Sequence, residues 1–538
     1  MRRQCVLLAA ACAAACLLSP ATAAATVPQR LAPAIAPLTG YDTALIGLRR
    51  SPAAEALVRA AGGEAVAPAL GIWRLPSGRA HAVVPMLRRA GLLRYVEPDR
   101  PQPKAAFTTG DPLAAPDIGW QLYRVGADQV TPPGPGAPVT IVDSGLDTTH
   151  MEFQKRPDTV LLNPQPARSW DAPSLYHGTF VSSVAAAPAD GLGTIGLYPT
   201  ALLHEYALNT TFDAPLTSDI VVGIDRAASS GHAVINLSLS GTAFSRAEYE
   251  AIIAATRHGS LVVAAAGNQF TAGSPREYPA SLPHVLTVAS TGMTDAPSSF
   301  SNRSETIDLA APGESIPVQH PTDPSMWRTV SGTSFSSPLV TAAAAWIWTL
   351  HPELDSAQVA GILRASARDI WTTGFDDRTG YGLLNLPAAI AQAAAPPDVQ
   401  EPNDDIDQIV PGRLFATGRT PITTLTKRSA RFTATLDVNE DPNDVYRVVI
   451  PARRTLTVTI AGSTNLGTIL WSSRARSVFA EGSTAQGRQL GASNRAGKAA
   501  ERIVYRNRTR AAITAYLDVW LARNSTRTAT YSATVSTR

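Results

Sequence analysis

Cysteine is almost absent from this chain of 538 residues, and its three copies, Cys5, Cys12 and Cys16, all lie near the N-terminus. They fall within or beside an apolar run over residues 6–18, which follows two arginines and precedes several small residues. This order is typical of an export signal, and the run is too short for a comfortable transmembrane span. We therefore predict a signal peptide over residues 1–25 and a mature protein with neither disulfides nor a stable membrane span. Lipidation of Cys12 or Cys16 is the alternative, but the alanine three positions before each is unusual for it.

A large excess of charge is also missing. Lys and Arg number 46 against 43 Asp and Glu, a net charge of +3, and no basic stripe with interleaved aromatic residues occurs. These features argue against nucleic acid as the principal partner, and the Arg-rich C-terminal region is better explained as a solvated strand face. A hydrophobic content of 45% over this length is enough for more than one packed core, so we expect at least three segments with different roles.

The most informative segment is residues 331–338, Ser-Gly-Thr-Ser-Phe-Ser-Ser-Pro, which precedes the Ala-rich apolar stretch 339–350. The pattern predicts a helix with Ser334 at its N-terminal end. Gly332 would permit a sharp turn, and the positive end of the helix would face the negative charge that forms when Ser334 attacks a carbonyl group. Ser and Thr are also ordinary helix caps, so this segment alone does not establish a nucleophile.

Three polar residues upstream supply the groups that a serine nucleophile needs. Asp143 ends an apolar run typical of a buried strand, His177 begins a segment with helical spacing, and Asn268 follows a buried-strand pattern over 262–266. A serine hydroxyl needs an imidazole to accept its proton, and the imidazole needs a carboxylate to hold its tautomer. We therefore expect Ser334 to act as nucleophile, His177 as general base and Asp143 as the partner that orients it. The Asn268 amide is the candidate donor to the oxyanion.

These residues resemble the subtilisin-like serine proteases, also called subtilases or peptidase family S8, in which the catalytic residues follow the chain order Asp, His, Ser. Further family-like segments occur in the expected order at residues 196–199, 235–241, 278–280, 299–302, 311–313 and 380–385. The resemblance covers residues 111–394. It implies a three-layer α/β domain with a largely parallel sheet, and peptide-bond hydrolysis through an acyl-enzyme with no cofactor required for the chemistry.

The resemblance also assigns a pocket for the substrate residue before the scissile bond. Its walls and floor would be formed by Ser238, Leu239, Ser240, Ala265, Ala266, Gly267 and Glu277. Ser240 stands where the family usually has glycine, so its side chain would narrow the cleft. Glu277, near the floor, would pair with an incoming Arg or Lys and would be costly to bury beside an apolar side chain. Alternatively, Glu277 turns to solvent or pairs with Arg276, which leaves the broad apolar preference common among subtilases.

Residues 26–110 resemble the inhibitory propeptide of subtilases, which guides folding and is cut at its C-terminal end. Hydrophobic periodicity predicts strands at 43–48, 71–75 and 93–99 and helices at 53–61 and 82–90. The resemblance implies a zymogen whose own propeptide inhibits the protease. A permanently attached N-terminal module is the alternative, and the Pro-rich stretch 98–111 disfavours it.

The composition changes after Ala394, where residues 395–402 form a predicted linker. Short runs with alternating hydrophobicity, such as 444–450 and 454–460, predict strands with one buried face. Residues 403–538 resemble the prepeptidase C-terminal domain of secreted bacterial proteases, which implies a β-sandwich. The self-contained pattern predicts a domain that folds on its own.

Two acidic clusters in this region, at residues 404–407 and 437–441, are candidate ligands for a structural calcium ion because Ca²⁺ prefers oxygen donors. Neither has the spacing of an EF-hand loop, so a solvated turn is the favoured interpretation. Metal binding is common in the subtilase family, but the sequence identifies no ligand set.

The sequence as a whole predicts a secreted serine endopeptidase, extracellular or associated with the cell envelope, made as a self-processing zymogen that cleaves proteins or peptides. The alternative from another class is a catalytically silent secreted binding or adhesive protein that keeps the fold. The joint presence of Asp143, His177, Ser334 and Asn268 argues against that alternative.

Overall fold

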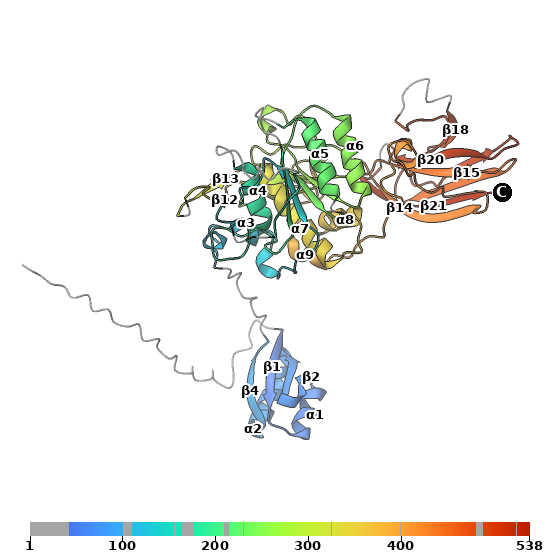
Figure 1. Cartoon of the computed structure of the whole chain (residues 1–538). Coiled ribbons are helices and arrows are strands. Elements are labelled where there is room, and N and C mark those ends of the chain that lie inside the picture. The colour runs from blue at the N-terminus through green and yellow to red at the C-terminus, as the bar shows by residue number, and fades with distance from the viewer. Residues whose placement is uncertain are drawn as a thin grey trace, which may run out of the picture. The chain divides into compact units, whose positions relative to one another are not determined.

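The computed structural model describes residues 42–99, 110–154, 156, 158–163, 176–208, 215–229, 231–323, 325–398, 400–479, 488–522 and 525–538. The predicted signal peptide and most of the Pro-rich stretch before the α/β domain lie outside the described residues, so both stay predictions. The chain divides into two compact units, Met1–Lys104 and Ala105–Arg538, which Figure 1 shows and which are described separately below.

The first unit is a small α/β fold with a four-stranded antiparallel sheet in the order β2-β3-β1-β4. Its elements are β1 (Thr43–Leu48), α1 (Pro52–Ala60), β2 (Glu64–Ala67), β3 (Ile72–Pro76), α2 (Ser77–Arg89) and β4 (Leu93–Pro98). The helices and the sheet share a core that includes Ile46, Val58, Trp73 and Leu87. This separate core agrees with the small α/β unit that the sequence predicts here, while its role as a propeptide stays a prediction.

Two features of the first unit differ from the sequence predictions. Strand β2 is an addition, and α2 begins at Ser77, before the predicted start at residue 82. Strand β2 has four residues with no fully buried position, so its hydrophobic pattern is weak. The first turn of α2 contains a polar Ser-Gly-Arg stretch, and the Ser77 N–H is held by the Asp42 carbonyl at 2.8 Å. A tertiary contact therefore decides the start of this helix.

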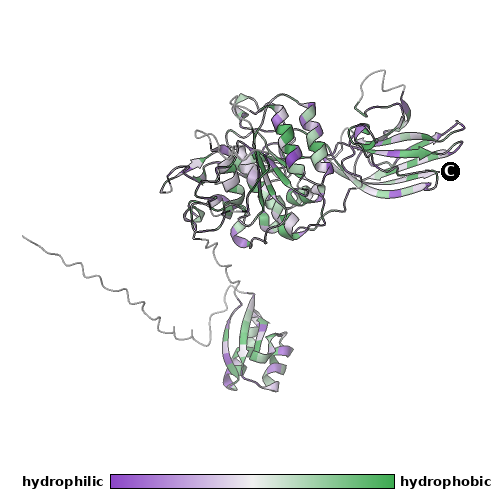
Figure 2. Ribbon diagram, viewed as in Figure 1, coloured by the Kyte–Doolittle hydropathy of each residue, from purple (hydrophilic) through white to green (hydrophobic). Residues whose placement is uncertain are grey.

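The second unit contains a seven-stranded sheet in the order β11-β10-β9-β8-β5-β7-β6, and every neighbouring pair is parallel. The strands are β5 (Val139–Asp143), β6 (Val160–Leu161), β7 (Leu203–Ala207), β8 (Val234–Leu237), β9 (Leu261–Ala265), β10 (Val285–Thr291) and β11 (Leu309–Pro312). Apart from the edge strand β6, they are nearly continuously buried because helices cover both faces. Figure 2 shows the hydrophobic character of this central sheet.

Helices on the two faces of the sheet make three layers. One core contains side chains from α4 (His177–Ala186), α7 (Thr333–Leu350), α8 (Ser356–Ser366) and α9 (Leu386–Ala391). The core on the other face contains side chains from α5 (Thr217–Ala228) and α6 (Arg246–Arg257). The three-layer α/β architecture with a parallel sheet is therefore confirmed.

Helix α7 is buried along almost its whole length, and Trp346 and Trp348 are among the largest fully buried side chains. It packs against strands β8, β9, β10 and β11, which explains its apolar composition. Across the described part of the chain, no helix combines the length and the apolar character needed to cross a membrane.

The predicted catalytic residues lie where strands end and helices begin. Strand β5 ends at Asp143, and Asn268 follows the end of β9. Helix α4 begins at His177, and Ser334 is the second residue of α7. The carboxyl ends of parallel strands form the edge at which open α/β sheets bind their ligands. The topology therefore explains why residues so distant in sequence share one site.

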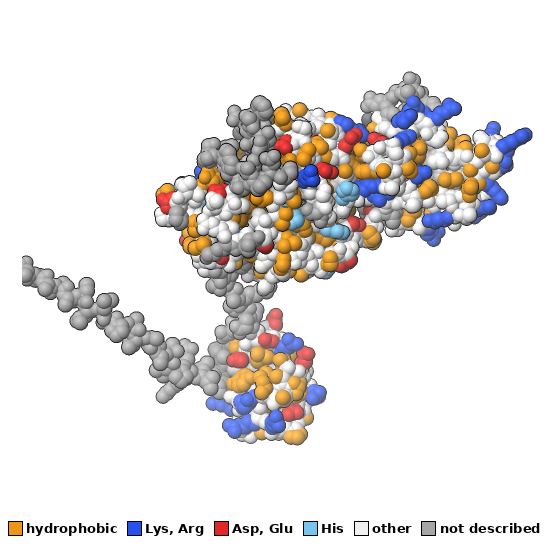
Figure 3. Space-filling view, viewed as in Figure 1, with side chains coloured by type: hydrophobic (Ala, Val, Ile, Leu, Met, Phe, Trp, Pro, Cys, Tyr) orange, Lys and Arg blue, Asp and Glu red, His pale blue; other side chains and the backbone are white. Residues whose placement is uncertain are grey.

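The C-terminal region consists of two four-stranded antiparallel sheets, in the orders β14-β21-β16-β19 and β15-β20-β17-β18. The strands are β14 (Ser429–Asp437), β15 (Asn443–Ile450), β16 (Thr455–Gly462), β17 (Leu466–Ser472), β18 (Gln489–Ser493), β19 (Glu501–Arg506), β20 (Ile513–Leu521) and β21 (Thr528–Thr537). Side chains from both sheets form one core, consistent with the predicted β-sandwich. Arg502 and Arg506 lie on the exposed side of β19 with Val504 between them, and Figure 3 shows Lys and Arg side chains over this region, as expected for a solvated strand face.

The predicted linker leads into an interface between the sandwich and the α/β domain. Just after the linker lies the short helix α10 (Ile406–Ile409), where Asp407 pairs with Arg246 of α6 at 2.8 Å. One turn earlier, Asp404 Oδ2 lies 2.8 Å from His284 Nε2. The two domains therefore have separate cores but also share polar contacts, one exposed and one buried.

Candidate active site

The Asp143–His177 pair depends on a close approach of α4 to the end of β5. A Cβ atom on Gly178 would lie 2.2 Å from the Gly145 carbonyl oxygen, so a side chain there would push α4 away from the strand. With glycine present, His177 Nδ1 lies 2.8 Å from Asp143 Oδ1. An ionised carboxylate can only accept a hydrogen bond, so the proton belongs on Nδ1 and the basic lone pair on Nε2. The Ser144 N–H also donates to Asp143 Oδ1, at 2.6 Å, and holds this carboxylate in place.

Ser334 lies at the N-terminal end of α7, one residue before Phe335, whose ring packs on His177 with centroids 5.6 Å apart. The Ser334 hydroxyl donates to the Ser238 carbonyl oxygen at 3.3 Å, and the Ser238 hydroxyl donates to the Ser334 carbonyl oxygen at 2.7 Å. Catalytic hydrogen bonds are often long or misaligned in a free enzyme and tighten when substrate binds. The structure therefore brings all three residues of the predicted triad to one edge of the sheet.

The orientation of Asn268 is set by Thr333. Asn268 Oδ1 accepts hydrogen bonds from the Thr333 N–H at 2.9 Å and from the Thr333 hydroxyl at 3.0 Å. The Gly267 N–H in turn donates to the Thr333 hydroxyl at 3.1 Å. Because Thr333 engages the carbonyl oxygen of exposed Asn268, its NH₂ group is the part of the side chain that can donate to a substrate. The first N–H groups of α7 have no intrahelical acceptor, so the Ser334 N–H is a second donor for an oxyanion.

Sequence reasoning missed Thr333 and also the buried Asn236. On β8, Asn236 donates to the Ser238 hydroxyl at 2.9 Å, and its Oδ1 accepts from Ser337 at 2.7 Å and from Thr341 at 3.1 Å. This network joins the end of β8 to α7 and so fixes Ser238 beside Ser334. The sequence did offer a signal for Asn236, because it is the one polar residue in the strand Val-Ile-Asn-Leu and a buried amide needs hydrogen-bond partners.

The predicted pocket walls come together at the end of β8 and β9. Ser238, Ala265, Ala266 and Gly267 are buried, Leu239 is half-buried and Ser240 is exposed. Two backbone hydrogen bonds between Gly241 and Tyr278, at 2.8 and 2.9 Å, join the first wall to the segment that carries Glu277. The candidate wall and floor residues are therefore neighbours in space.

Glu277 neither turns to solvent nor pairs with its neighbour, which corrects the alternative raised from the sequence. Its side chain is 2% exposed, and no ion pair joins it to exposed Arg276 in the part of the chain that the structure describes. Glu277 Oε1 accepts from Asn302 Nδ2 at 3.1 Å, whereas Oε2 is buried and has no hydrogen-bond partner among the described residues. A Cβ atom on Gly267 would lie 2.6 Å from this carboxylate. Glu277 therefore packs directly against Gly267, the residue that precedes Asn268 in the chain.

The two acidic clusters are not solvated turns, so that interpretation is wrong. Asp404, Asp405 and Glu440 are all buried. Asp404 contacts His284, Asp405 Oδ1 accepts from the N–H of Ile406 at the start of α10, and Asp437 Oδ1 holds the turn that follows β14. Within the described residues, the carboxylates that gather closely enough for a metal ion are Asp398, Glu401, Asp441 and Asp444, and of these Asp441 alone belongs to a predicted cluster.

Comparison with known proteins agrees with the resemblance to subtilases that the sequence motifs indicate. A family model described as "Subtilase family" matches residues 134–382, a range that contains all four predicted catalytic residues. Subtilisin from Bacillus pumilus is 31% identical over 258 residues, which is 48% of this chain and 91% of that protein. An alkaline protease from Shouchella clausii is 30% identical over 300 residues, 55% of this chain and 74% of its own. Subtilisin amylosacchariticus from Bacillus subtilis subsp. amylosacchariticus is 32% identical over 258 residues; the match covers 48% of this chain and 66% of that relative's length.

Proposed function

Since the chain belongs to the subtilase family of serine endopeptidases, we propose that it is a secreted, self-processing enzyme that hydrolyses peptide bonds in proteins or peptides. The observation that carries the catalytic part of this proposal is the 2.8 Å contact between His177 Nδ1 and buried Asp143, next to the helix end that carries Ser334. It supplies a base with its lone pair on the nitrogen that a serine hydroxyl must reach.

In the proposed reaction, Ser334 Oγ attacks the scissile carbonyl carbon while His177 Nε2 takes the hydroxyl proton. Asp143 stabilises the imidazolium that forms, and the Asn268 amide and the Ser334 N–H donate to the oxyanion. The tetrahedral intermediate collapses, the C–N bond breaks and His177 gives its proton to the leaving amine. Water then attacks the acyl-enzyme by the same route and releases the acid product and free Ser334.

The first experiment compares the full chain with its Ser334→Ala variant on a protein substrate and a chromogenic peptide. We expect loss of roughly a millionfold in kcat, the size of effect seen when the nucleophile of subtilisin is removed. Ser229→Ala is the matched control, because Ser229 is an exposed serine at the end of α5. Equal activity of Ser334→Ala and the parent protein would support the alternative of a silent binding protein with a contaminating protease.

We propose that the first unit is the propeptide and inhibitor of the same chain. It has its own core, and the Pro-rich stretch after it is a plausible site for cleavage by Ser334. Export of the Ser334→Ala variant should therefore yield an uncut precursor, detectable by intact mass and N-terminal sequencing. Processing of the purified variant to the mature end would instead require a second protease.

We propose further that Glu277 gives the enzyme a preference for Arg or Lys before the scissile bond. A buried carboxylate with one unpaired oxygen is stabilised by an incoming cation and is costly beside an apolar side chain. Glu277→Gln keeps the volume and a hydrogen-bonding oxygen but removes the charge. It should lower kcat/KM for Arg and Lys peptides by roughly thirtyfold or more and spare apolar ones.

The measurement for Glu277 is a peptide library varied at that single substrate position. Arg276→Gln is the matched control, because this adjacent charge is exposed and should leave the profile unchanged. If the parent enzyme and Glu277→Gln shared one profile dominated by Phe, Leu or Tyr, the basic-residue preference would be wrong.

A further inference from the structure

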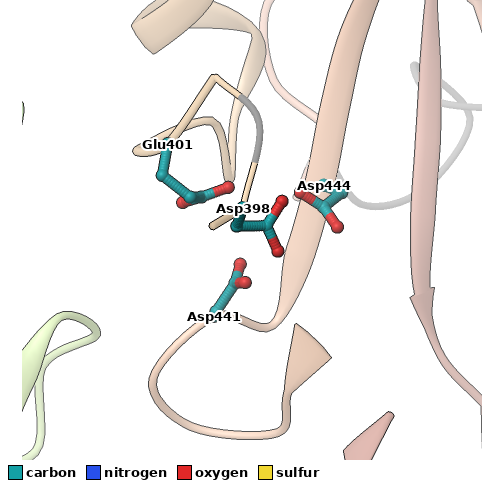
Figure 4. Close-up of side chains that lie close together, drawn as sticks. All are labelled: Asp398, Glu401, Asp441 and Asp444. Atoms are coloured by element: carbon teal, nitrogen blue, oxygen red, sulfur yellow. The ribbon is translucent and has the colours of Figure 1, made fainter. Parts of the chain in front are cut away.

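Four carboxylate side chains gather where the chain enters the C-terminal sandwich (Figure 4). Asp398 and Glu401 come from the predicted linker, Asp441 from the turn after β14, and Asp444 from β15. One oxygen from each lies within 4.8 Å of the others. Residues up to 46 positions apart in sequence therefore place four acidic groups around one point.

The buried member of this group, Asp444, is directed at a place where the protein supplies no donor. Asp444 is 0% exposed, and its Oδ2 accepts from the Tyr531 hydroxyl at 2.6 Å. Its Oδ1 is buried with no hydrogen-bond partner among the described residues. Glu401 and Asp441 also have buried oxygens with no hydrogen-bond partner among the described residues. A buried acceptor without a donor is costly, and a buried negative charge without a counter-charge is more so.

The nearby cationic side chain of Arg419 is directed at the backbone. Its guanidinium donates a hydrogen bond to the carbonyl oxygen of Glu401. Burial raises the pKa of Glu401, Asp441 and Asp444 well above the ordinary carboxyl range, and the neighbouring carboxylates raise it further. Four acidic groups this close together repel one another when charged, and a cation between them would remove that repulsion.

We propose that Asp398, Glu401, Asp441 and Asp444 bind a calcium ion. The donors are all oxygen, which suits a hard divalent cation and not zinc, whose sites favour nitrogen and sulfur. The 4.8 Å limit on the distances between donor oxygens is about twice a Ca²⁺–O distance of roughly 2.3–2.6 Å. Magnesium requires Mg²⁺–O distances of about 2.0–2.1 Å, so it would need a tighter group.

The position of the site gives the ion a structural role. The residue before Asp441 is Glu440, whose carboxylate lies 4.0 Å from Arg364 on α8 of the α/β domain. Asp398, Glu401 and Asp441 also line a cavity of about 730 Å³ whose walls come from both domains, which provides a route for the ion. A bound ion would join the linker to the turn after β14 and thereby hold the sandwich against the α/β domain.

The test uses the full chain in the Ser334→Ala background, which prevents self-digestion, after removal of metal with EDTA. Titration with CaCl₂ should raise the thermal unfolding midpoint by roughly 3–8 °C at a hundredfold excess over Kd. MgCl₂ should have a smaller effect. Isothermal titration calorimetry on the same sample measures the stoichiometry and the affinity.

Asp441→Asn should weaken calcium binding by at least about tenfold, and Glu401→Gln should do the same. Without metal, both variants should melt above the parent protein, because each removes one charge from a repulsive group. If the carboxylate acted only by accepting hydrogen bonds, its replacement would instead lower the melting temperature of the metal-free protein. Glu353→Gln is the matched control, since exposed Glu353 lines the same cavity outside the group.

Two results would overturn the proposal. One is the lack of any calcium-dependent shift in the parent protein. The other is an equal shift in Asp441→Asn and Glu401→Gln, which would place the calcium elsewhere in the chain. Equal stabilisation by magnesium would overturn the assignment of the ion. None of these measurements depends on proteolysis, so the proposal stands or falls separately from the proposed enzymatic function.

Discussion

In the active site one buried carboxylate, Asp143, faces a histidine, whereas at the start of the sandwich four carboxylates face one another. His177 and the Ser144 N–H hold Asp143 in a single orientation. At the proposed calcium site, Glu401, Asp441 and Asp444 each have a buried oxygen with no hydrogen-bond partner among the described residues. The difference indicates that the chain alone supplies the groups of the active site, whereas at the second site the proposed ion from solution would supply the missing positive charge.

The largest expected effect comes from breaking the Asp143–His177 pair in the active site. Asp143→Asn keeps the shape but offers an amide in place of the carboxylate, so His177 loses the partner that fixes its tautomer. We expect kcat to fall by about 10⁴-fold. Steady-state kinetics on a chromogenic peptide measures it, with circular dichroism to show that the fold is kept. A fall of less than tenfold would contradict the role given to Asp143.

The second-largest effect is expected at the interface between the α/β domain and the sandwich. Arg364 Nη1 lies 3.1 Å from Asp308 Oδ1 and 4.0 Å from Glu440 Oε2. Arg364→Met leaves these two acids without their cation and should cost about 3–5 kcal/mol of stability near neutral pH. Burial raises the pKa of Asp308 to about 6 even with Arg364 present, so protonation should reduce the cost below that pH. Denaturant unfolding at pH 5 and pH 8 checks this, and an equal cost at both pH values would show that charge is not the cause.

A smaller effect is expected from the oxyanion donor. Asn268→Leu should lower kcat by about a hundredfold to a thousandfold with little change in KM. Thr333→Val removes one of the two hydrogen bonds that orient Asn268, so its loss should be smaller and also confined to kcat. A change mainly in KM for either variant would mean that Asn268 binds the substrate and does not stabilise the transition state.

The smallest expected effect is a pH dependence of stability that arises from the carboxylates at the start of the sandwich. The folded, metal-free protein retains protons on Glu401, Asp441 and Asp444 at pH values where the unfolded chain has lost them, because burial raises their pKa values. The folded state then binds more protons than the unfolded state, so stability should fall as pH rises above the ordinary carboxyl pKa of about 4. Calcium should flatten this dependence. Unfolding midpoints between pH 5 and pH 8, with EDTA and with CaCl₂, measure the difference, and parallel curves would contradict it.

Much of the active site could be predicted from the sequence because its signals are local. Asp143 ends an apolar strand, His177 begins a helix, and Ser334 follows a glycine at the start of another helix. Each signal spans fewer than ten residues, and a parallel sheet brings such strand ends to one edge. The same locality explains why the strands at 444–450 and 454–460 were predicted with nearly their observed bounds.

Other features have no local signal. Ser77 and Thr333 look like ordinary polar residues until a distant backbone group or Asn268 is placed beside them. The acidic clusters illustrate the same limit, because residues adjacent in sequence, such as Asp404 and Asp405, point to different partners in space.

The sequence by itself determined the protease domain, its chain order of catalytic groups and the change to a β-rich C-terminal region, because side-chain periodicity and short motifs encode strands, helices and turns. The tertiary structure alone decided that Glu277 is buried against Gly267 and that Asp398, Glu401 and Asp444 meet Asp441 around one point. Burial and charge proximity depend on which distant segments pack together. No local pattern specifies that packing.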